Sequence, residues 1–438
     1  MSLVSMPHSN NSRHSQHQNQ QEPEERFEKV SLMRCAPETD DAAVMQKTQE
    51  CIGLLGELPS EIQNARTIAV KINAGIHRVV TLHGKQTELT DPAVVEGTIR
   101  ALRAITDAEL LVGDAPTDGD AASLYAKLGL PERLSRYPNV RLVDFNASEL
   151  VDVEMPHSQP MFSRYTLPRE LAQADAFVSV AKMKAHASMG CTLCIKNLFG
   201  WMPTAVYGAP RMYLHDRLIR LPRVLSDMAQ WMRPSLNVID GIVALNKQEW
   251  HGETLSPGLL LAGTNIVATD SVGARAMGFN PQGDYPEAPF YYRRNAIELA
   301  AQAGLGPNES DRIQVIGPTP EEVVTLFDVE AYEGNTRRPE QLQRGAECVA
   351  QYRAQQAELA SRYHGRYLAL FDGEVLWDGP DMKTMQRLEH ESGRDWQNVP
   401  QFVVRCVPPD EEIENLDWYA HEAQFATQKV PQQAELAV

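Results

Sequence analysis

The sequence predicts an α/β protein whose mainly parallel sheet is flanked by helices, followed by a small C-terminal ββαβ module. Two observations lead to this fold class. Strand-like and helix-like segments alternate between residues 27 and 330 without a hairpin pattern, which favours parallel strands joined by helices. A hydrophobic content of 43% and a charged content of 23% are those of an ordinary globular protein with a substantial core.

The first half of the chain contains four expected strands. The first lies at residues 66–72, and Asp91 and Pro92 then begin a helix, because aspartate caps helices and proline fits the first helical position. Val95, Ile99 and Leu102 continue this helix at the expected spacing. Further strands are expected at 109–113, 140–145 and 175–180, with a helix at 118–128 between the first two of these.

The second half continues the alternation. A helical region at residues 214–232 precedes expected strands at 236–240 and 258–263. Asp270 is expected to cap a further helix that Gly278 ends, and residues 312–317 are typical of a late strand. These elements form the main domain, residues 27–335. The polar residues 1–26 before it are expected to be a disordered tail.

The C-terminal part is expected to contain two further units. Residues 336–363 are rich in Glu, Gln, Arg and Ala and predict a connecting helix. Residues 364–420 predict a small α+β module, because Asp372 and Gly373 separate two strand-like runs as in a β-hairpin. Residues 421–438 are assigned to a tail. We expect the module to dock on the main domain or on another subunit, so a homo-oligomer is one of the outcomes.

Charge and hydropathy argue against two classes of protein, nucleic-acid binders and membrane proteins. The formal net charge of −17 argues against a general nucleic-acid or anionic-membrane binder, since both need a basic surface. No apolar run approaches the ~20 residues of a membrane-spanning helix, and residues 1–25 offer no apolar signal core. We therefore expect a cytoplasmic protein whose partner is a small molecule.

Polar side chains recur where the predicted strands end. Asn73 and Asp114 follow two strands, Asp240 ends another, and Lys182, Lys184 and His186 follow the strand at 175–180. A pocket across the carboxyl ends of a parallel sheet requires such a distribution. Each residue alone also has a purely structural explanation, because Asp and Asn begin turns and lysine is usually solvated.

The residue types indicate a site for a small anionic molecule that bears a phosphate or a carboxylate. Lys184, His186 and Lys196 are the catalytic candidates, since a desolvated lysine can act as a base or nucleophile. The substrate-binding candidates are Asn73, Asp114, Lys182, Asn197, Arg211 and His215. The basic stretch that includes Arg211 and His215 is equally compatible with a solvated amphipathic helix.

Metal and redox chemistry remain alternatives. Asp240 and Asp270 are candidate oxygen ligands for a divalent metal, although no recognised metal spacing is present. Cys191 and Cys194 form a lone CxxC pair among apolar residues, where packing is the more common role of cysteine. The pair could instead serve redox chemistry or hold a metal. No cofactor is identified, and no integral ferredoxin-type cluster is expected from six cysteines with one close pair.

The main domain resembles the prokaryotic family of domain of unknown function 362 over roughly residues 60–310. The similar segments are Lys71-Ile-Asn73, Thr90-Asp91-Pro92, Gly113-Asp114, Lys182-Met-Lys184-Ala-His186, Thr192, Lys196-Asn197-Leu-Phe-Gly200, Asp240-Gly241 and Ala268-Thr-Asp270. Many relatives carry an attached ferredoxin-like cysteine cluster, which implies redox work in part of that family. This chain lacks the cluster. The C-terminal module resembles a separate small domain of unknown function.

Two functions follow from these patterns. The preferred one is a cytoplasmic enzyme that acts on a small anionic metabolite at the carboxyl ends of the strands, with its reaction undetermined. The alternative is a redox, iron–sulfur or metal-handling accessory protein in which Cys191 and Cys194 are the working residues.

Overall fold

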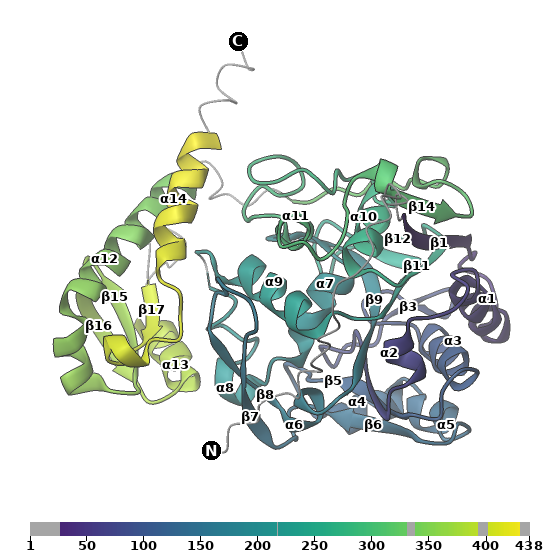
Figure 1. The fold of residues 1–438 in the computed structure, drawn as a ribbon, viewed down its shortest axis with the longest axis horizontal. Helices are drawn as coiled ribbons and strands as arrows, with labels where there is room; N and C mark the ends of the chain where they lie inside the picture. The colour runs from purple at the N-terminus through teal and green to yellow at the C-terminus, as the bar shows by residue number, and fades with distance from the viewer. Residues whose placement is uncertain (1–26, 217, 331–337, 393–401, 430–438) are drawn as a thin grey trace, which may run out of the picture.

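The computed structural model describes residues 27–216, 218–330, 338–392 and 402–429 (Figure 1). Its centre is a ten-stranded sheet in the order β14-β1-β13-β11-β9-β2-β5-β6, in which β10 also pairs with β9 and β12 with β11. The strands are β1 (Glu28–Arg34), β2 (Thr67–Ile72), β5 (Glu109–Asp114), β6 (Val140–Asp144), β9 (Ala176–His186), β10 (Gly190–Thr192), β11 (Leu236–Asn246), β12 (Glu253–Leu255), β13 (Leu259–Gly263) and β14 (Ile313–Ile316).

The sheet is mostly parallel, and the predicted fold class is confirmed. Strands β11, β9, β2, β5 and β6 form a continuous parallel block. Strand β13 runs antiparallel to both β11 and β1, while β14 is parallel to β1. Because the carboxyl ends of the parallel block share one edge, side chains that leave different strands can meet there.

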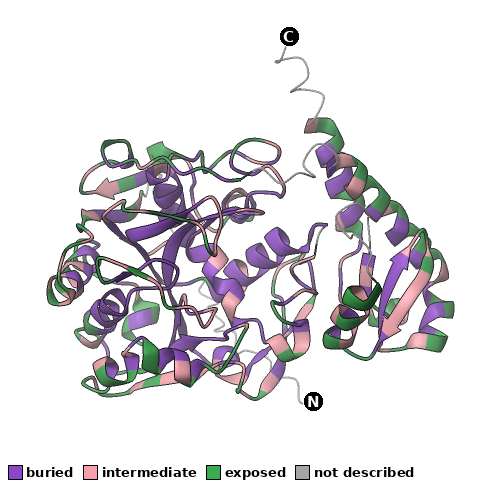
Figure 2. Ribbon diagram, turned by 180° about the vertical axis from the view of Figure 1, so that it is seen from behind, coloured by how far each residue is buried: buried purple, intermediate pink, exposed green. Residues whose placement is uncertain are grey.

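Helices cover both faces of the sheet. One face packs against α1 (Asp41–Gly53), α3 (Pro92–Arg103), α4 (Ala121–Lys127) and α5 (Leu130–Leu134). The other packs against α7 (Cys194–Asn197), α9 (Arg220–Met232), α10 (Ile266–Ala276) and α11 (Ala296–Gln302). The strands of the sheet are accordingly buried, and exposed residues lie mainly on the outer helices and loops (Figure 2).

Several short elements connect these layers. They are α2 (Ser60–Gln63), α6 (Arg169–Ala172), α8 (Thr204–Tyr207), the two-stranded sheet of β3 (Thr81–Leu82) and β4 (Lys85–Gln86), and the hairpin of β7 (Leu150–Glu154) and β8 (Arg164–Pro168). The sequence analysis did not predict this hairpin, which lies between two strands of the predicted alternation.

Two local predictions about α10 and α3 have different outcomes. Asp91 caps α3 as expected, because its carboxylate accepts the Ala93 N–H at 2.9 Å. The predicted capping role of Asp270 is wrong. Asn265 caps α10, and Asp270 lies inside that helix, where its carboxylate accepts the N–H groups of Cys194 and Ile195, each at 2.8 Å. Asp270 therefore stabilises the beginning of α7.

Strand β9 is longer than predicted. It extends from Ala176 to His186, so Lys182, Lys184 and His186 lie on the strand rather than after it. All eleven residues are buried. Charged side chains are tolerated in this buried strand because neighbouring carboxylates, carbonyls and amides bind them.

The C-terminal module contains α12 (Arg338–Tyr363), β15 (Tyr367–Phe371), β16 (Glu374–Gly379), α13 (Met382–Ser392), β17 (Phe402–Arg405) and α14 (Asp417–Lys429). Its sheet has the order β16-β15-β17 and is antiparallel. The hairpin turn is where the sequence predicts it, with positive φ at Asp372 and Gly373. Residues 421–429, which the sequence analysis assigned to a tail, belong to α14. The predictions for residues 1–26 and 430–438 lie outside the described residues.

The module lies beside the main domain, with α14 close to the region of α9 and α11 (Figure 1). Its apolar side chains belong to the same hydrophobic cluster as those of α9. Two of its carboxylates bind arginines of the main domain. Glu414 accepts from Arg220 at 2.7 Å, and Glu422 binds Arg223 as well as Arg294 at 3.2 Å. Docking therefore combines apolar burial with buried ion pairs.

Within the described part of the chain, we find no helix that combines the length and the apolar character needed to cross a membrane.

Candidate functional site

A hydrogen-bonded network joins β2, β9 and α7 at the strand ends. Asn73 follows β2 and Lys184 lies on β9, and the Lys184 ammonium donates to the side-chain Oδ1 of Asn73 at 3.3 Å. The same ammonium donates to the carbonyl of Glu88 at 3.0 Å and lies 3.7 Å from the centre of the Trp250 ring. Asn73 also donates to the side chain of Asn197 at 3.4 Å. Asn73 thus contacts two other predicted site residues, Lys184 and Asn197.

Lys71 and Asp114 extend this network as a buried ion pair. The Lys71 ammonium lies 2.7 Å from the Asp114 carboxylate, and both side chains are 1% exposed. Lys71 also donates to Asn197 at 3.3 Å. A Cβ added at Gly200 would lie 2.4 Å from Asp114 and 2.6 Å from Lys71, so only glycine fits there. Lys71 has no predicted role, although it lies in the predicted strand 66–72, two residues before Asn73.

Lys182 and Asp240 form a second buried pair. They are direct neighbours on the parallel strands β9 and β11, and their charged atoms are 3.0 Å apart. The Asp240 carboxylate also accepts the Asp91 N–H at 2.8 Å. Both side chains are fully buried. The carboxylate of Asp240 is thus bound to an ammonium and to the beginning of α3.

A cationic cluster lies beside this network. It consists of Lys196, His186, His215 and Arg293, with Glu249 as the nearby carboxylate. The rings of His186 and His215 are stacked with centres 6.3 Å apart, and His186 lies 3.5 Å from Glu249. Among the described residues, the Lys196 ammonium makes no hydrogen bond or ion pair, and contacts the Phe199 ring at 4.8 Å.

Arg293 is the least satisfied member of this cluster. It is 4% exposed, and its Nε and Nη1 groups have no hydrogen-bond partner within the described parts of the chain. Its remaining nitrogen donates to the carbonyl of Asp216, whose carboxylate lies 3.7 Å from Nη1. A buried guanidinium with unused donors is costly unless another group binds it. The sequence analysis missed Arg293 and Glu249, because neither stands in a motif or at a predicted strand end.

Burial and neighbouring cations change the protonation of the cluster. Burial lowers the pKa of Lys196 to about 8, with Arg211, Arg293 and Lys71 acting in the same direction and Glu249 opposing them. Burial also holds the pKa of His186 well below its ordinary value, and the charges of Lys196 and Lys184 add to this effect. Burial and the charge of Arg293 do the same for His215. Both imidazoles are therefore neutral at pH 7.

Arg211 binds the backbone of the site. Its guanidinium donates to the carbonyls of Met202 at 2.6 Å and Gly200 at 2.7 Å, and also to that of Ala115. Burial lowers the pKa of Arg211 to about 10. The side chain therefore holds the loop after α7 against the end of β5, and its charge contributes to the field around Lys196.

The described residues contain no group of three or more His, Cys, Asp or Glu side chains that could hold a metal ion. Asp240 is bound to Lys182, and Asp270 to two backbone N–H groups. Burial raises the pKa of Asp270 to about 7, against the lowering effect of these N–H groups. A metal at Asp240 or Asp270 would have to compete with these contacts.

Cys191 and Cys194 are free, buried thiols. Burial raises the pKa of both, and the charge of Asp270 adds to the effect. The Cys194 thiol points to the backbone, with its sulfur 3.6 Å from the carbonyl oxygen of Val238. A thiol with a raised pKa is a poor nucleophile and metal ligand, so these surroundings favour packing.

Replacing both cysteines by alanine is expected to lower stability by roughly 1–2 kcal/mol through small cavities and to leave metal content unchanged. Thermal denaturation and metal analysis of anaerobically purified protein would measure both effects. A stoichiometric metal that is present in the parent protein and lost in the double variant would contradict the packing role.

The fold and the site together define an α/β protein with a buried cationic site at the ends of its parallel strands. Residues 68–275, which lie within the main domain, match the family described as domain of unknown function (DUF362). The match includes Asn73, Lys184, His186, Lys196 and Asn197, but not Arg293.

A curated relative is the thylakoid-associated protein sll1697 of Synechocystis sp., which is 26% identical over 170 residues. The match covers 39% of this chain and 53% of the relative, so the chain spans about half the length of that protein.

Two solved structures show low overall similarity. The lactate racemase apoprotein from Thermoanaerobacterium thermosaccharolyticum has a TM-score of 0.31 and 11% identity, with 56% of each chain covered. A protein from Thermotoga maritima has a TM-score of 0.29 and 14% identity, covering 53% of this chain and 57% of that one. Neither similarity bears on the chemistry of the site.

Proposed function

We propose that this chain is a cytoplasmic enzyme that acts on a small metabolite bearing a phosphate or carboxylate, bound at the carboxyl ends of the parallel strands. One observation carries the proposal. Lys196 and the buried Arg293 bring unused donors and positive charge to one cluster, where Glu249 and Asp216 are the nearby carboxylates. An anion would satisfy these donors and offset the charge, and charge-assisted hydrogen bonds are among the strong contacts in proteins.

The surrounding residues include candidates for proton transfer and groups that would hold the site rigid. His215 is a neutral imidazole beside cations and is the candidate to accept a proton from a bound molecule. His186 Nδ1 accepts the Ser188 N–H at 3.2 Å, so its Nε2 carries the proton and can donate a hydrogen bond to an anion. Lys184, whose pKa burial holds well below its ordinary value, is a further candidate for proton transfer. Lys71, Asp114, Asn73 and Asn197 bind one another and would keep the strand ends rigid around the ligand.

Lys196→Ala is expected to weaken binding of inorganic phosphate or malonate by about ten- to a hundredfold, because a charge-assisted contact is typically worth ~1.5–3 kcal/mol. Titration calorimetry would measure the affinities, and circular dichroism would check the fold. The exposed Lys127→Ala variant is the matched control and should bind like the parent protein. Equal affinity of the Lys196→Ala and parent proteins would contradict the proposal.

The same titration should depend on pH. Since the pKa of Lys196 in the free protein is about 8, the cationic form is lost as pH rises through this value. The affinity for malonate, whose carboxylates stay ionised in this range, should therefore decrease between about pH 7 and 9 in the parent protein, while Lys196→Arg, whose guanidinium stays charged, should show a weaker decrease. Cell fractionation would test the cytoplasmic location, with a membrane-associated fraction as the opposing result.

A further inference from the structure

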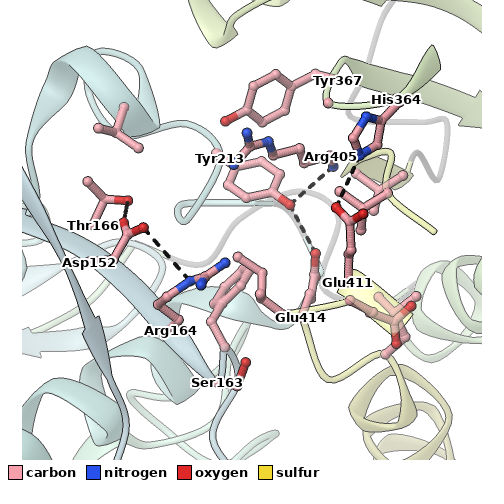
Figure 3. A pocket seen from close by; sticks show the side chains of 18 of the residues that line it. Asp152, Ser163, Arg164, Thr166, Tyr213, His364, Tyr367, Arg405, Glu411 and Glu414 are labelled. Atoms are coloured by element: carbon pink, nitrogen blue, oxygen red, sulfur yellow. Dashed lines mark hydrogen bonds and ion pairs between the residues drawn. The ribbon is translucent and has the colours of Figure 1, made fainter. Parts of the chain in front are cut away.

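A cavity lies between the main domain and the C-terminal module, and none of the residues of the cationic cluster lines it. Its volume is about 550 Å³, within the range of small-molecule sites. The hairpin of β7 and β8 forms one wall, and the module forms the other (Figure 3). Because both walls must be in place, the cavity exists only when the module is docked.

The register of the hairpin presents polar side chains to this cavity. Asp152 pairs with Thr166 and Glu154 with Arg164 across the two antiparallel strands, so these four side chains share one face. The Thr166 hydroxyl donates to Asp152 at 2.7 Å, and Arg164 lies 4.0 Å from both carboxylates. Each ion pair is long, so neither carboxylate has a close cationic partner here.

The main domain and the module each contribute a tyrosine ring to the cavity, Tyr213 and Tyr367. The rings of Tyr213 and Tyr367 meet edge to face with centres 5.1 Å apart. Tyr367 is only 8% exposed, and its hydroxyl has no hydrogen-bond partner among the described residues. Figure 3 shows this hydroxyl directed across the cavity toward the hairpin side. A hydroxyl that lines a cavity without a protein partner is available as donor and acceptor for a bound molecule.

The charges that line the cavity favour a cation. The carboxylates are Asp152, Glu154, Asp410, Glu411, Glu412 and Glu414, whereas Arg164 and Arg405 are the lining arginines. Glu414 and Glu412 are paired with Arg220 and Arg353, which do not line the cavity. An excess of negative charge remains among the other lining groups. Aromatic faces also attract cations.

We propose that this cavity binds a small organic amine, with Asp152 accepting from its ammonium group and Tyr367 contacting its polar or aromatic part. An aromatic monoamine combines a positive charge with a flat apolar body, and both match the walls of the cavity. Binding would bridge the hairpin and the module and stabilise the docked arrangement.

Titration calorimetry of the full chain with tyramine tests the proposal. The matched probes are 4-ethylphenol, which lacks the amine, and 3-(4-hydroxyphenyl)propionate, which replaces it by a carboxylate. We expect tyramine to bind and both analogues to bind at least about tenfold more weakly, because they lose the charge-assisted contact. No binding of tyramine, or equal binding of either analogue, would overturn the proposal.

Point variants test whether tyramine binds in this cavity. Asp152→Asn should weaken the binding of tyramine by about tenfold or more. Tyr367→Phe, which removes only the unpartnered hydroxyl, should weaken it by a smaller factor. Glu57→Gln, at an exposed carboxylate elsewhere, is the control and should leave binding unchanged. If Asp152→Asn and Glu57→Gln bind tyramine equally, the amine is attracted by the net negative charge of the whole chain and the assignment to this cavity is wrong.

Discussion

Replacing Asp240 by alanine is expected to destabilise the protein by about 3–5 kcal/mol, because the buried ammonium of Lys182 would lose the carboxylate that pairs with it at 3.0 Å. The substitution also removes the acceptor of the Asp91 N–H at the beginning of α3. Chemical denaturation of the variant and the parent protein would measure the loss. A loss below about 1 kcal/mol, typical of an exposed pair, would contradict this account.

A double variant distinguishes the contribution of the buried charges to stability from the contribution of packing. Lys182→Met with Asp240→Leu removes both charges and keeps apolar volume, so it should recover much of the stability lost by Asp240→Ala. Treatment of the parent protein with a chelator tests the metal hypothesis for the same carboxylate. If Asp240 serves to hold a metal, the chelator should reproduce the destabilisation, whereas the ion pair with Lys182 predicts no effect.

Glu414→Ala is expected to weaken docking of the C-terminal module by about 3–5 kcal/mol, since Arg220 would lose its buried carboxylate. Arg220 is 1% exposed and lies over the Tyr213 and Phe402 rings, so solvent cannot replace Glu414. Hydrogen exchange should show faster exchange in α12 and α14, with little change in the central sheet.

The control for this prediction is Glu347→Ala on the exposed side of α12, which should leave exchange in α14 unchanged. Faster exchange across the whole sheet in Glu414→Ala would mean that module and main domain unfold as one cooperative unit. Unchanged exchange everywhere would show that apolar contacts alone hold the module in place.

Local patterns predicted much of the fold. The alternation of strand-like and helix-like runs predicted the parallel block from β11 to β6, and Asp91 with Pro92 marked the beginning of α3. The Asp372-Gly373 turn predicted the hairpin of β15 and β16. These features depend on contacts within a few residues, and such contacts can be read from the sequence.

Two local predictions were wrong because residues distant in the sequence bind the side chains concerned. The lysines of β9 suggested a loop after Val180, yet Asp240 binds Lys182 and lets the strand continue. Asp270 has the residue type of a helix cap, but the helix that it stabilises is α7 rather than its own. In both cases the partner is more than fifty residues away in the sequence.

The sequence by itself determined the fold class, the main strands and the placement of Asn73 and Asp114 at strand ends. Only the tertiary structure decided which charges are paired: Lys71 with Asp114 and Lys182 with Asp240, while Lys196 and Arg293 keep unused donors. The reason is physical. Secondary structure follows from backbone preferences and short-range periodicity, whereas the state of a buried charge depends on groups that the fold brings within a few ångströms.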